Sequence, residues 1–394
     1  MKSKKEKKFF SFENTDKIKE KEAEMVEPPV KRRVPLFSKI LLSIGAVCLV
    51  LYVFLRNIPS LADFFNKYIS PVVRAALSYA TTWIPFSLAE TIIILLPIII
   101  IAIVSIGVKK YCDSWRNIGV FCIIMLSIGA YIFSTYAIGF VPSYYGSSLD
   151  KKMGLDKQPV SGDELYFTAD IISEALSKDI EHITYNSEGF SVMPYGYEEL
   201  NDKLMAAYER AIEKYDFISP LHSNIKEIAL SEPMTYTHIS GVYTFFTGEA
   251  NINVNYPDYI LPYTAAHEFA HQRGIARENE ANFVAFLVCI ESDDPYIRYS
   301  AYLNMYEYLS GPLYSANPSA ASYIYQSLPA GAKSDMSAYS KFFNKYRKTV
   351  VSEVSNAVND ASIKLNGDAQ GSKSYGMVVD LTVAYYKAQE IPRQ

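Results

Sequence analysis

The chain has 394 residues, of which 49% are hydrophobic and 20% are charged, and its formal net charge is −4. Nucleic acid is not indicated as a partner, because proteins that bind it usually carry a strongly basic surface. The hydrophobic residues are concentrated in three runs before residue 141, whereas the rest is ordinary globular sequence rich in tyrosine. Cys289 is the single cysteine of that later part, so the fold there must be stable without an internal disulfide.

The three apolar runs predict a membrane domain over residues 36–139. Each run approaches the roughly 20 residues that a helix needs to cross a bilayer, so we expect three transmembrane helices in contact with membrane lipid. Buried core helices, or a cleaved signal peptide for the first run, are the alternatives. The first run begins too late and is too long for a signal peptide. The predicted spans are 36–55, 91–108 and 117–138.

The distribution of Lys and Arg predicts the orientation of these spans. Residues 1–35 are rich in lysine and mix bases with acids, so we expect a disordered cytoplasmic tail. Basic residues also fill the short loop between the second and third spans but are sparse in 57–90. The positive-inside rule then puts the N-terminus in the cytoplasm and residues 140–394 outside it, in a multi-pass protein of the cell membrane. Apolar residues at helical spacing within 57–90 predict a helix that either lies at the membrane interface or packs on the globular part.

Residues 140–394 predict a mainly helical, α+β domain with a small sheet. An aromatic and β-branched run at 242–246 favours a strand, and a second strand is expected at 250–256, where apolar residues and Asn alternate with period two. Residues 315–334 are rich in Ser, Ala, Pro and Gly, which favours a loop or short helical turns. Helical periodicity marks 162–176, 196–215, 297–312, 335–365 and 373–389.

The segment between Pro262 and Gly274 carries the chemistry. Proline suits the first turn of a helix and glycine its end, so the segment predicts a helix. It contains His267-Glu268-Phe-Ala-His271, and a spacing of four puts both imidazoles on one face, where both can bind one Zn²⁺. Glu268 is then placed to act as general base on a water at the metal. With only five histidines in the chain, a chance occurrence of this pattern is rare.

A zinc site needs a third protein ligand, and two glutamates lie just downstream. On a second helix Glu278 shares a face with Ala281, Asn282 and Ala285, and the small alanines let the two helices approach closely. Glu280 faces elsewhere, so we favour Glu278 and keep Glu280 as the alternative ligand. A solvated residue in the first turn is the other interpretation of Glu278. Asn282, one turn further on, is a candidate for orienting a ligating histidine.

At these residues the chain resembles known zinc peptidases. His-Glu-x-x-His followed by Glu-x-x-Ala-Asn is similar to the gluzincin type, in which the first Glu of the second motif is the third ligand; here this is Glu278. The string from His267 to Phe283, preceded by Phe-Thr-Gly-Glu-Ala-Asn, resembles a family of uncharacterised bacterial membrane proteins known as a domain of unknown function. The resemblance implies the membrane architecture, a zincin-like domain and peptidase activity, but no substrate. The chain departs from many gluzincins in the six residues between His271 and Glu278 and in the Asn at 282.

Two further roles are expected by analogy with zinc peptidases. A strand upstream of the catalytic helix commonly pairs with an extended substrate, which would give this role to Asn251, Asn253 and Asn255. An ordinary surface strand is the alternative. A tetrahedral intermediate also needs a stabilising group besides zinc, and His238 and Tyr263 are candidates that no spacing singles out.

The sequence thus predicts a membrane-anchored zinc metallopeptidase with one Zn²⁺, hydrolysing peptide or amide bonds with a zinc-activated water. Its substrate would be a peptide or protein outside the cytoplasm. The alternative is a non-catalytic zinc-binding sensor or scaffold, which would not require Glu268. An intramembrane protease is disfavoured by polar flanks around the histidines, and a transporter by the lack of charges within the spans.

Overall fold

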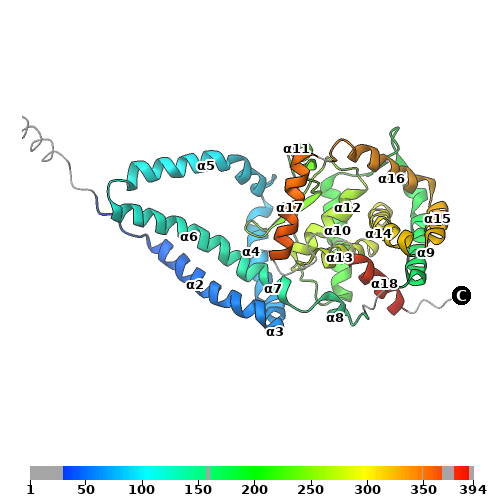
Figure 1. The fold of residues 1–394 in the computed structure, drawn as a ribbon, viewed down its shortest axis with the longest axis horizontal. Coiled ribbons are helices and arrows are strands. Elements are labelled where there is room, and N and C mark those ends of the chain that lie inside the picture. Colours follow the sequence, from blue (N-terminus) through cyan, green and yellow to red (C-terminus); the bar gives the residue numbers. More distant parts are fainter. Residues whose placement is uncertain (1–29, 157–159, 348, 366–376, 390–394) are drawn as a thin grey trace, which may run out of the picture.

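The structure is a computed structural model that describes residues 30–156, 160–347, 349–365 and 377–389. Most of the tail predicted over 1–35 lies outside these residues. The molecule is elongated, with three long helices at one end and a helical globular part with small sheets at the other (Figure 1).

Three helices are long and apolar enough to cross a membrane, as predicted. The first and third lie along each other, and a Cβ on Gly45 would meet that of Ala130 at 2.8 Å, so this contact requires a glycine. The middle helix has almost all of its large apolar side chains exposed, which suits a lipid environment. The three are α2 (Leu36–Asn57), α5 (Leu88–Tyr111) and α6 (Trp115–Gly139).

The segment between the first two spans packs on the globular part, which decides between the two alternatives for 57–90. Its helices contact the small sheet and the end of the third span. Two short helices after the third span continue this layer. The segment forms α3 (Pro59–Phe64), the π-helix η1 (Phe65–Ile69) and α4 (Ser70–Thr82), and the two short helices are α7 (Val141–Tyr145) and α8 (Leu149–Met153).

The predicted helices of the globular part form, with two corrections. Residues 315–334 were expected to be a loop or short turns, but Pro318 starts a ten-residue helix whose first turn is capped by the Asn317 side chain. The expected helix 335–365 is two helices, since residues 344–347 form a turn. The helices are α9 (Gly162–Asp179), α10 (Tyr197–Lys214), α11 (Ser231–Thr235), α14 (Pro295–Ala316), α15 (Pro318–Ser327), α16 (Ala330–Phe343), α17 (Val350–Leu365) and α18 (Val378–Ala388), with a 3-10 turn η2 (Ile180–His182).

The main sheet has three strands in the order β3-β5-β4. Its central strand runs parallel to β3 and antiparallel to β4, and all four of its residues are buried. The last strand, β4, is therefore an edge of the sheet. The strands are β3 (Ile225–Glu227), β4 (Gly241–Thr244) and β5 (Glu249–Ile252), and a separate hairpin pairs β1 (Thr184–Tyr185) with β2 (Ser191–Val192).

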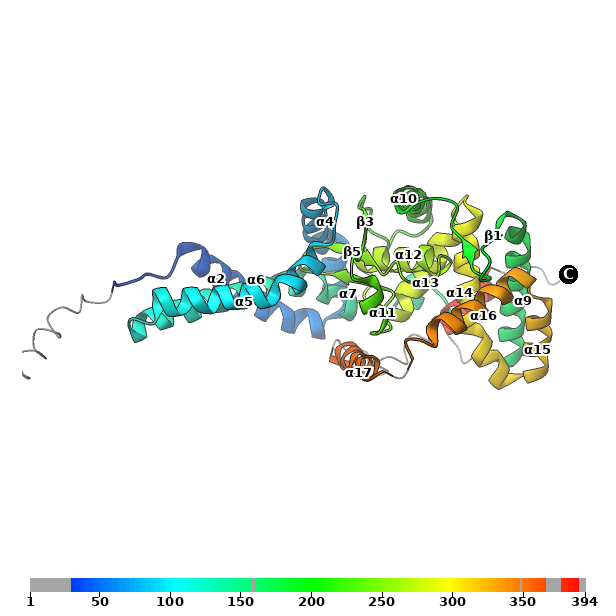
Figure 2. The same cartoon turned by 90° about the horizontal axis from the view of Figure 1, so that it is seen from above.

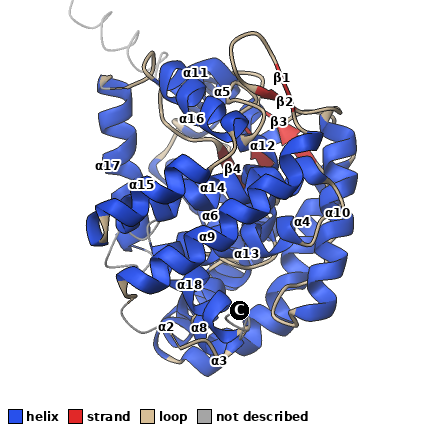
Figure 3. Ribbon diagram, turned by 90° about the vertical axis from the view of Figure 1, so that its right-hand side faces the viewer, coloured by secondary structure: helices blue, strands red, loops and turns tan. Residues whose placement is uncertain are grey.

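Two helices, α12 (Ile260–Gln272) and α13 (Glu278–Ile290), lie in the middle of the globular part (Figure 3). Every residue of α12 is buried, because the helix contacts β4 and β5 as well as α13 and α14. A helix covered on all sides has no polar face for solvent. The polar residues that α12 carries therefore need partners inside the protein.

Candidate metal centre

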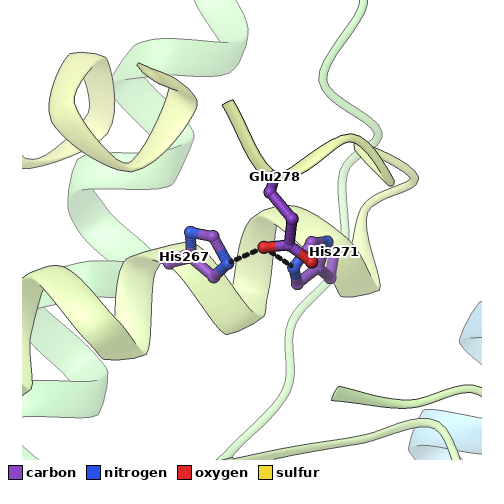
Figure 4. Close-up of side chains that lie close together, drawn as sticks. All are labelled: His267, His271 and Glu278. Atoms are coloured by element: carbon purple, nitrogen blue, oxygen red, sulfur yellow. Dashed lines mark ion pairs between the residues drawn. The ribbon is translucent and has the colours of Figure 1, made fainter. Parts of the chain in front are cut away.

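The turn between α12 and α13 sets the geometry of the site. Gly274 has a φ of +91°, which favours glycine because a side chain there is strained. The Gly274 N–H donates to the His271 carbonyl at 3.0 Å, and the Ile275 N–H donates to the Ala270 carbonyl at 3.0 Å. These two bonds form a Schellman motif, which ends α12 and reverses the chain. After the turn α13 begins at Glu278, next to the face of α12 that carries the histidines (Figure 4).

Three potential metal ligands converge there (Figure 4). Glu278 Oε2 lies 3.2 Å from His267 Nε2 and 3.5 Å from His271 Nε2. Zinc ligands about 2.0–2.1 Å from a tetrahedral ion stand roughly 3.3 Å from one another. Two imidazole nitrogens and one carboxylate at these separations fit a zinc site with one position left open.

A backbone carbonyl orients one of the two histidines. His271 Nδ1 lies 2.7 Å from the Ile275 carbonyl oxygen, which can only accept, so Nδ1 carries a proton and Nε2 is the nitrogen that faces the site. Ile275, and not the expected Asn282, supplies the group that orients His271. Gly274 was the available signal, because the Schellman turn that it permits brings the Ile275 carbonyl under the ring.

The three side chains shift one another's ionisation. Burial opposes ionisation of Glu278, but the two histidines outweigh it and hold the pKa of this carboxyl well below its ordinary value. Burial likewise opposes the charged form of His271, yet Glu278 prevails and raises the pKa of His271 to about 9. The Glu278 carboxylate thus favours a proton on the His271 imidazole. A divalent cation bound by these side chains would take the place of that proton.

Glu268 lines the same cavity as the three ligands. Burial raises the pKa of its carboxyl, partly offset by the two nearby histidines and by a hydrogen bond from the Tyr243 backbone. The backbone of β4 lies directly over it: a Cβ added to Gly241 would approach Glu268 Oε1 to 2.6 Å. Gly241 is therefore required for the strand to pass this close, a role that the sequence analysis did not identify.

Glu280, the alternative ligand, lies in a different environment. Its Oε1 accepts the Leu149 N–H at 2.9 Å and pairs with Arg277 Nη1 at 2.9 Å. Arg277 also donates to the carbonyls of Tyr144 and Gly146. Glu280 thus fastens the chain between α7 and α8, and only Glu278 stands between the histidines.

The proposed stabilising groups are partly committed elsewhere. Tyr263 lines the cavity, but its hydroxyl donates to the Asn282 carbonyl at 2.8 Å, so it is not free to serve an oxyanion. His238 also lines the cavity, with Nε2 held 2.8 Å from the Tyr346 carbonyl. Asn282 does line the cavity, beside Tyr308.

The role given to the three asparagines near β5 is wrong. β5 is hydrogen-bonded to a strand on both sides, so it has no edge to offer a substrate. Asn251 Nδ2 donates to the Val242 carbonyl, and Asn253 Nδ2 donates to the Ile239 carbonyl. Asn255, beyond the strand, donates from Nδ2 to Thr235 Oγ1 and Tyr346 Oη. The amides of Asn251 and Asn253 thus satisfy backbone carbonyls, and the amide of Asn255 satisfies two side-chain hydroxyls.

Of the two edge strands, β3 and β4, it is β4 that borders the cavity. The Asn253 N–H donates to the Ser240 carbonyl, and in an antiparallel ladder every second residue faces its partner strand. The intervening residues, Gly241 and Tyr243, therefore turn their main-chain groups away from β5. The cavity beside them measures about 840 Å³ and also receives Phe140 at the end of α6, with Asn356 and Asn359 of α17.

The segment between the first two spans, from α3 to α4, supports the candidate metal centre; together with α7 and α8 it is called the membrane-side layer. Arg74 of α4 is buried, and its Nη1 donates to Asn66 Oδ1 and to the Gly139 carbonyl at the end of α6, both at 2.9 Å. Asn66 Nδ2 in turn donates to the Gly274 carbonyl at 2.9 Å. One buried network thus connects the third span to the turn that follows His271.

A second buried contact ties the start of α5 to the sheet. Lys226 of β3 donates to the carbonyls of Thr81 and Ile84 and lies 3.2 Å from a carboxylate oxygen of Glu249 on β5. Glu249 accepts the N–H groups of Leu88 and Ala89, the first residues of α5, which is the favoured place for a carboxylate at a helix. The membrane spans are thus docked onto the same sheet that borders the cavity.

The chain was compared with protein families, curated proteins and solved structures. The family described as "Protein of unknown function (DUF3810)" matches residues 65–383, which include two of the three spans, the docked layer and the metal centre. No curated protein and no solved structure matches the chain. The match covers most of the sequence, and the protein belongs to this family of unknown function.

Proposed function

We propose that this protein is a membrane-anchored zinc metallopeptidase. The observation that carries the proposal is the convergence of His267, His271 and Glu278 beside Glu268. A zinc-binding scaffold would need the three ligands alone. Hydrolysis requires a general base in addition, and Glu268 is placed to supply it.

The residues have separate roles in the proposed reaction. His267, His271 and Glu278 would hold one Zn²⁺, which when bound acts as a Lewis acid and lowers the pKa of water. Glu268 accepts the proton of the attacking water and passes it to the leaving amine. The burial that raises the pKa of Glu268 strengthens it as a base. The Ile275 carbonyl keeps His271 in the tautomer that presents Nε2 to the site.

The edge of β4 supports a peptide as the substrate class. An extended peptide can add to a free strand edge through main-chain hydrogen bonds, which do not depend on its side chains. The Tyr243 N–H already donates to Glu268, and a peptide that pairs with the remaining outward groups of Gly241 and Tyr243 would pass over the site. The cavity therefore favours a polypeptide over a compact small molecule.

We further propose that the globular part lies outside the cytoplasm, as the positive-inside rule predicts. A reporter that is active in only one compartment, fused to the C-terminus, tests this placement. Activity of a cytoplasm-specific reporter would show that the proposed orientation is wrong, but it would not bear on the proposed metal chemistry.

The full chain, purified in detergent, tests the metal assignment. We expect one Zn²⁺ per chain in the wild type and in Glu280→Gln, and a loss of zinc in Glu278→Gln. The two variants make the same change two residues apart, so any general effect of removing a buried carboxylate appears in both. Wild-type protein that binds no zinc would overturn the proposal.

The catalytic assignment needs a second variant. Glu268→Gln should keep its zinc, because residue 268 is not one of the proposed ligands. Its cleavage of a mixed peptide library, measured by mass spectrometry, should fall about 10²–10⁴-fold. A zinc-loaded wild type that cleaves no peptide would instead support the scaffold alternative.

A further inference from the structure

Helix α17 has little contact with the rest of the molecule. It stands apart from the other helices of the globular part in Figure 2. Most of its described side chains are exposed or half-buried. An isolated helix of 16 residues is marginally stable in water, so a helix this exposed needs a partner to cover it.

The start of α17 is nevertheless well positioned. Thr349 and Ser352 cap it reciprocally, each backbone N–H donating to the other's hydroxyl at 3.0–3.1 Å. Just before it, the Tyr346 ring packs against Tyr236 with centroids 4.9 Å apart, and its hydroxyl accepts from Asn255. The helix thus extends from an anchored point on the globular part.

The two faces of α17 differ sharply. At 100° per residue, Val350, Val351, Val354 and Val358 fall within one arc of about 100°. These four side chains are 51–77% exposed. Asn356 and Asn359 fall on the opposite side and line the cavity of the metal centre. The apolar face therefore points away from the cavity, and the polar face points into it.

The position of α17 indicates what covers its apolar face. The helix runs crosswise to the spans at the level where α6 ends (Figure 1), and it is set apart from α6 and α7 in the view of Figure 2. Phe140, the first residue after α6, lines the same cavity as Asn356 and Asn359, so the helix and the end of a span border one space. A helix lying flat at the level where the spans end, with valines on one face, matches the geometry of an interfacial helix.

We propose that α17 lies on the membrane surface on the side of the globular part, with its valine face in the lipid and its asparagines over the metal cavity. The helix carries Glu353, Asp360 and Lys364, so it has no excess of positive charge. Its binding is hydrophobic and does not require anionic lipid. The metal cavity then opens beside the bilayer, where peptides tethered to the membrane have a higher local concentration than free ones.

Fluorescent probes on the full chain in vesicles test this contact. The exposed Cys112 and Cys122 are replaced by Ser, and an environment-sensitive dye is attached through Val354→Cys or Val358→Cys. Phosphatidylcholine with brominated acyl chains should quench both probes at least about two-fold relative to unbrominated lipid. Adding an anionic lipid should not change the quenching.

Two control positions separate lipid contact from other causes. Tyr323→Cys on α15 is similarly exposed but lies at the far end of the globular part, and Glu353→Cys lies on α17 outside the apolar arc. Both should be quenched less than the valine positions. Unquenched probes at 354 and 358 would overturn the proposal, and energy transfer between labelled copies without lipid quenching would identify a second chain as the occupant. The readout needs neither zinc nor hydrolysis, so its failure is distinguishable from failure of the proposed function.

Discussion

Two groups of residues support the candidate metal centre. One is close to it in the sequence, and the other is distant from it in the sequence. On one side, the α12–α13 turn brings His267, His271 and Glu278 together within twelve residues. On the other, Asn66 and Arg74 support the same turn from about 200 residues away. The first side is a local motif, and the second is a contact between the membrane-side layer and the globular part.

The buried contacts of Asn66, Arg74 and Lys226 predict that residues 140–394 depend on the segment before them for stability. A fragment of residues 140–394 would lack Asn66 and Arg74 below Gly274, and it would expose the buried Lys226. The family match begins at residue 65, which includes this support. Experiments on the metal site therefore use the full chain, and the variants below weaken one side of the centre at a time.

Breaking the distant side should have the largest effect. Arg74→Met leaves the Gly139 carbonyl without its buried donor, at about 1–3 kcal/mol, and removes one of the two donors to Asn66 Oδ1, so we expect a loss of about 2–4 kcal/mol in stability. Thermal unfolding in detergent measures it. The control is Lys67→Met on the neighbouring π-helix. It removes an exposed ion pair with Asp216 and should change the stability little. Equal melting temperatures for Arg74→Met and wild type would show that the contacts of Arg74 do not stabilise the protein.

Breaking the local side comes next. Gly274→Ala puts a side chain at positive φ, where it also meets the Arg74 guanidinium, so we expect about 2–3 kcal/mol of destabilisation. Because the turn holds the Ile275 carbonyl under His271, zinc affinity should fall about tenfold as well. Competition with a fluorescent chelator measures the affinity. Gly311→Ala, where an added Cβ meets no atom within 4 Å, serves as the matched control.

A smaller change should separate catalysis from metal binding. In Gly241→Ala the added methyl group would displace Glu268 or push β4 outward, while the three ligands are untouched. We expect peptide hydrolysis to fall about 10- to 100-fold with one zinc per chain retained. If zinc and activity were lost together, Gly241 would be needed for the fold of the site as a whole and not specifically for the position of Glu268.

The smallest effect concerns pH. Burial, with Asp335 nearby, raises the pKa of Glu307 in the cavity wall to about 7. An acid whose folded pKa lies above its unfolded value costs stability as pH rises between the two values, here from about 4.5 to about 7. Glu307→Gln should therefore melt like wild type near pH 4.5 and be about 1–2 kcal/mol more stable at pH 8. A difference independent of pH would show that ionisation of Glu307 is not its cause.

The local features of the site follow from the sequence because they depend on residues a few positions apart. The spacing of His267 and His271, the turn at Gly274 and the preference for Glu278 over Glu280 all rest on helix periodicity, and the structure brings these three ligands together. The spans follow for a similar reason, since a run of apolar residues has a length that can be read directly.

Only the tertiary structure decided which strand has a free edge, which groups orient His271 and what supports the turn. Asn251 and Asn253 have the same alternating pattern in a central strand as in an edge strand, because period two says nothing about neighbours. Arg74 and Lys226 look like surface cations until segments distant along the chain bury them. Such contacts join residues with no regular spacing, and they arise only when the whole chain has packed.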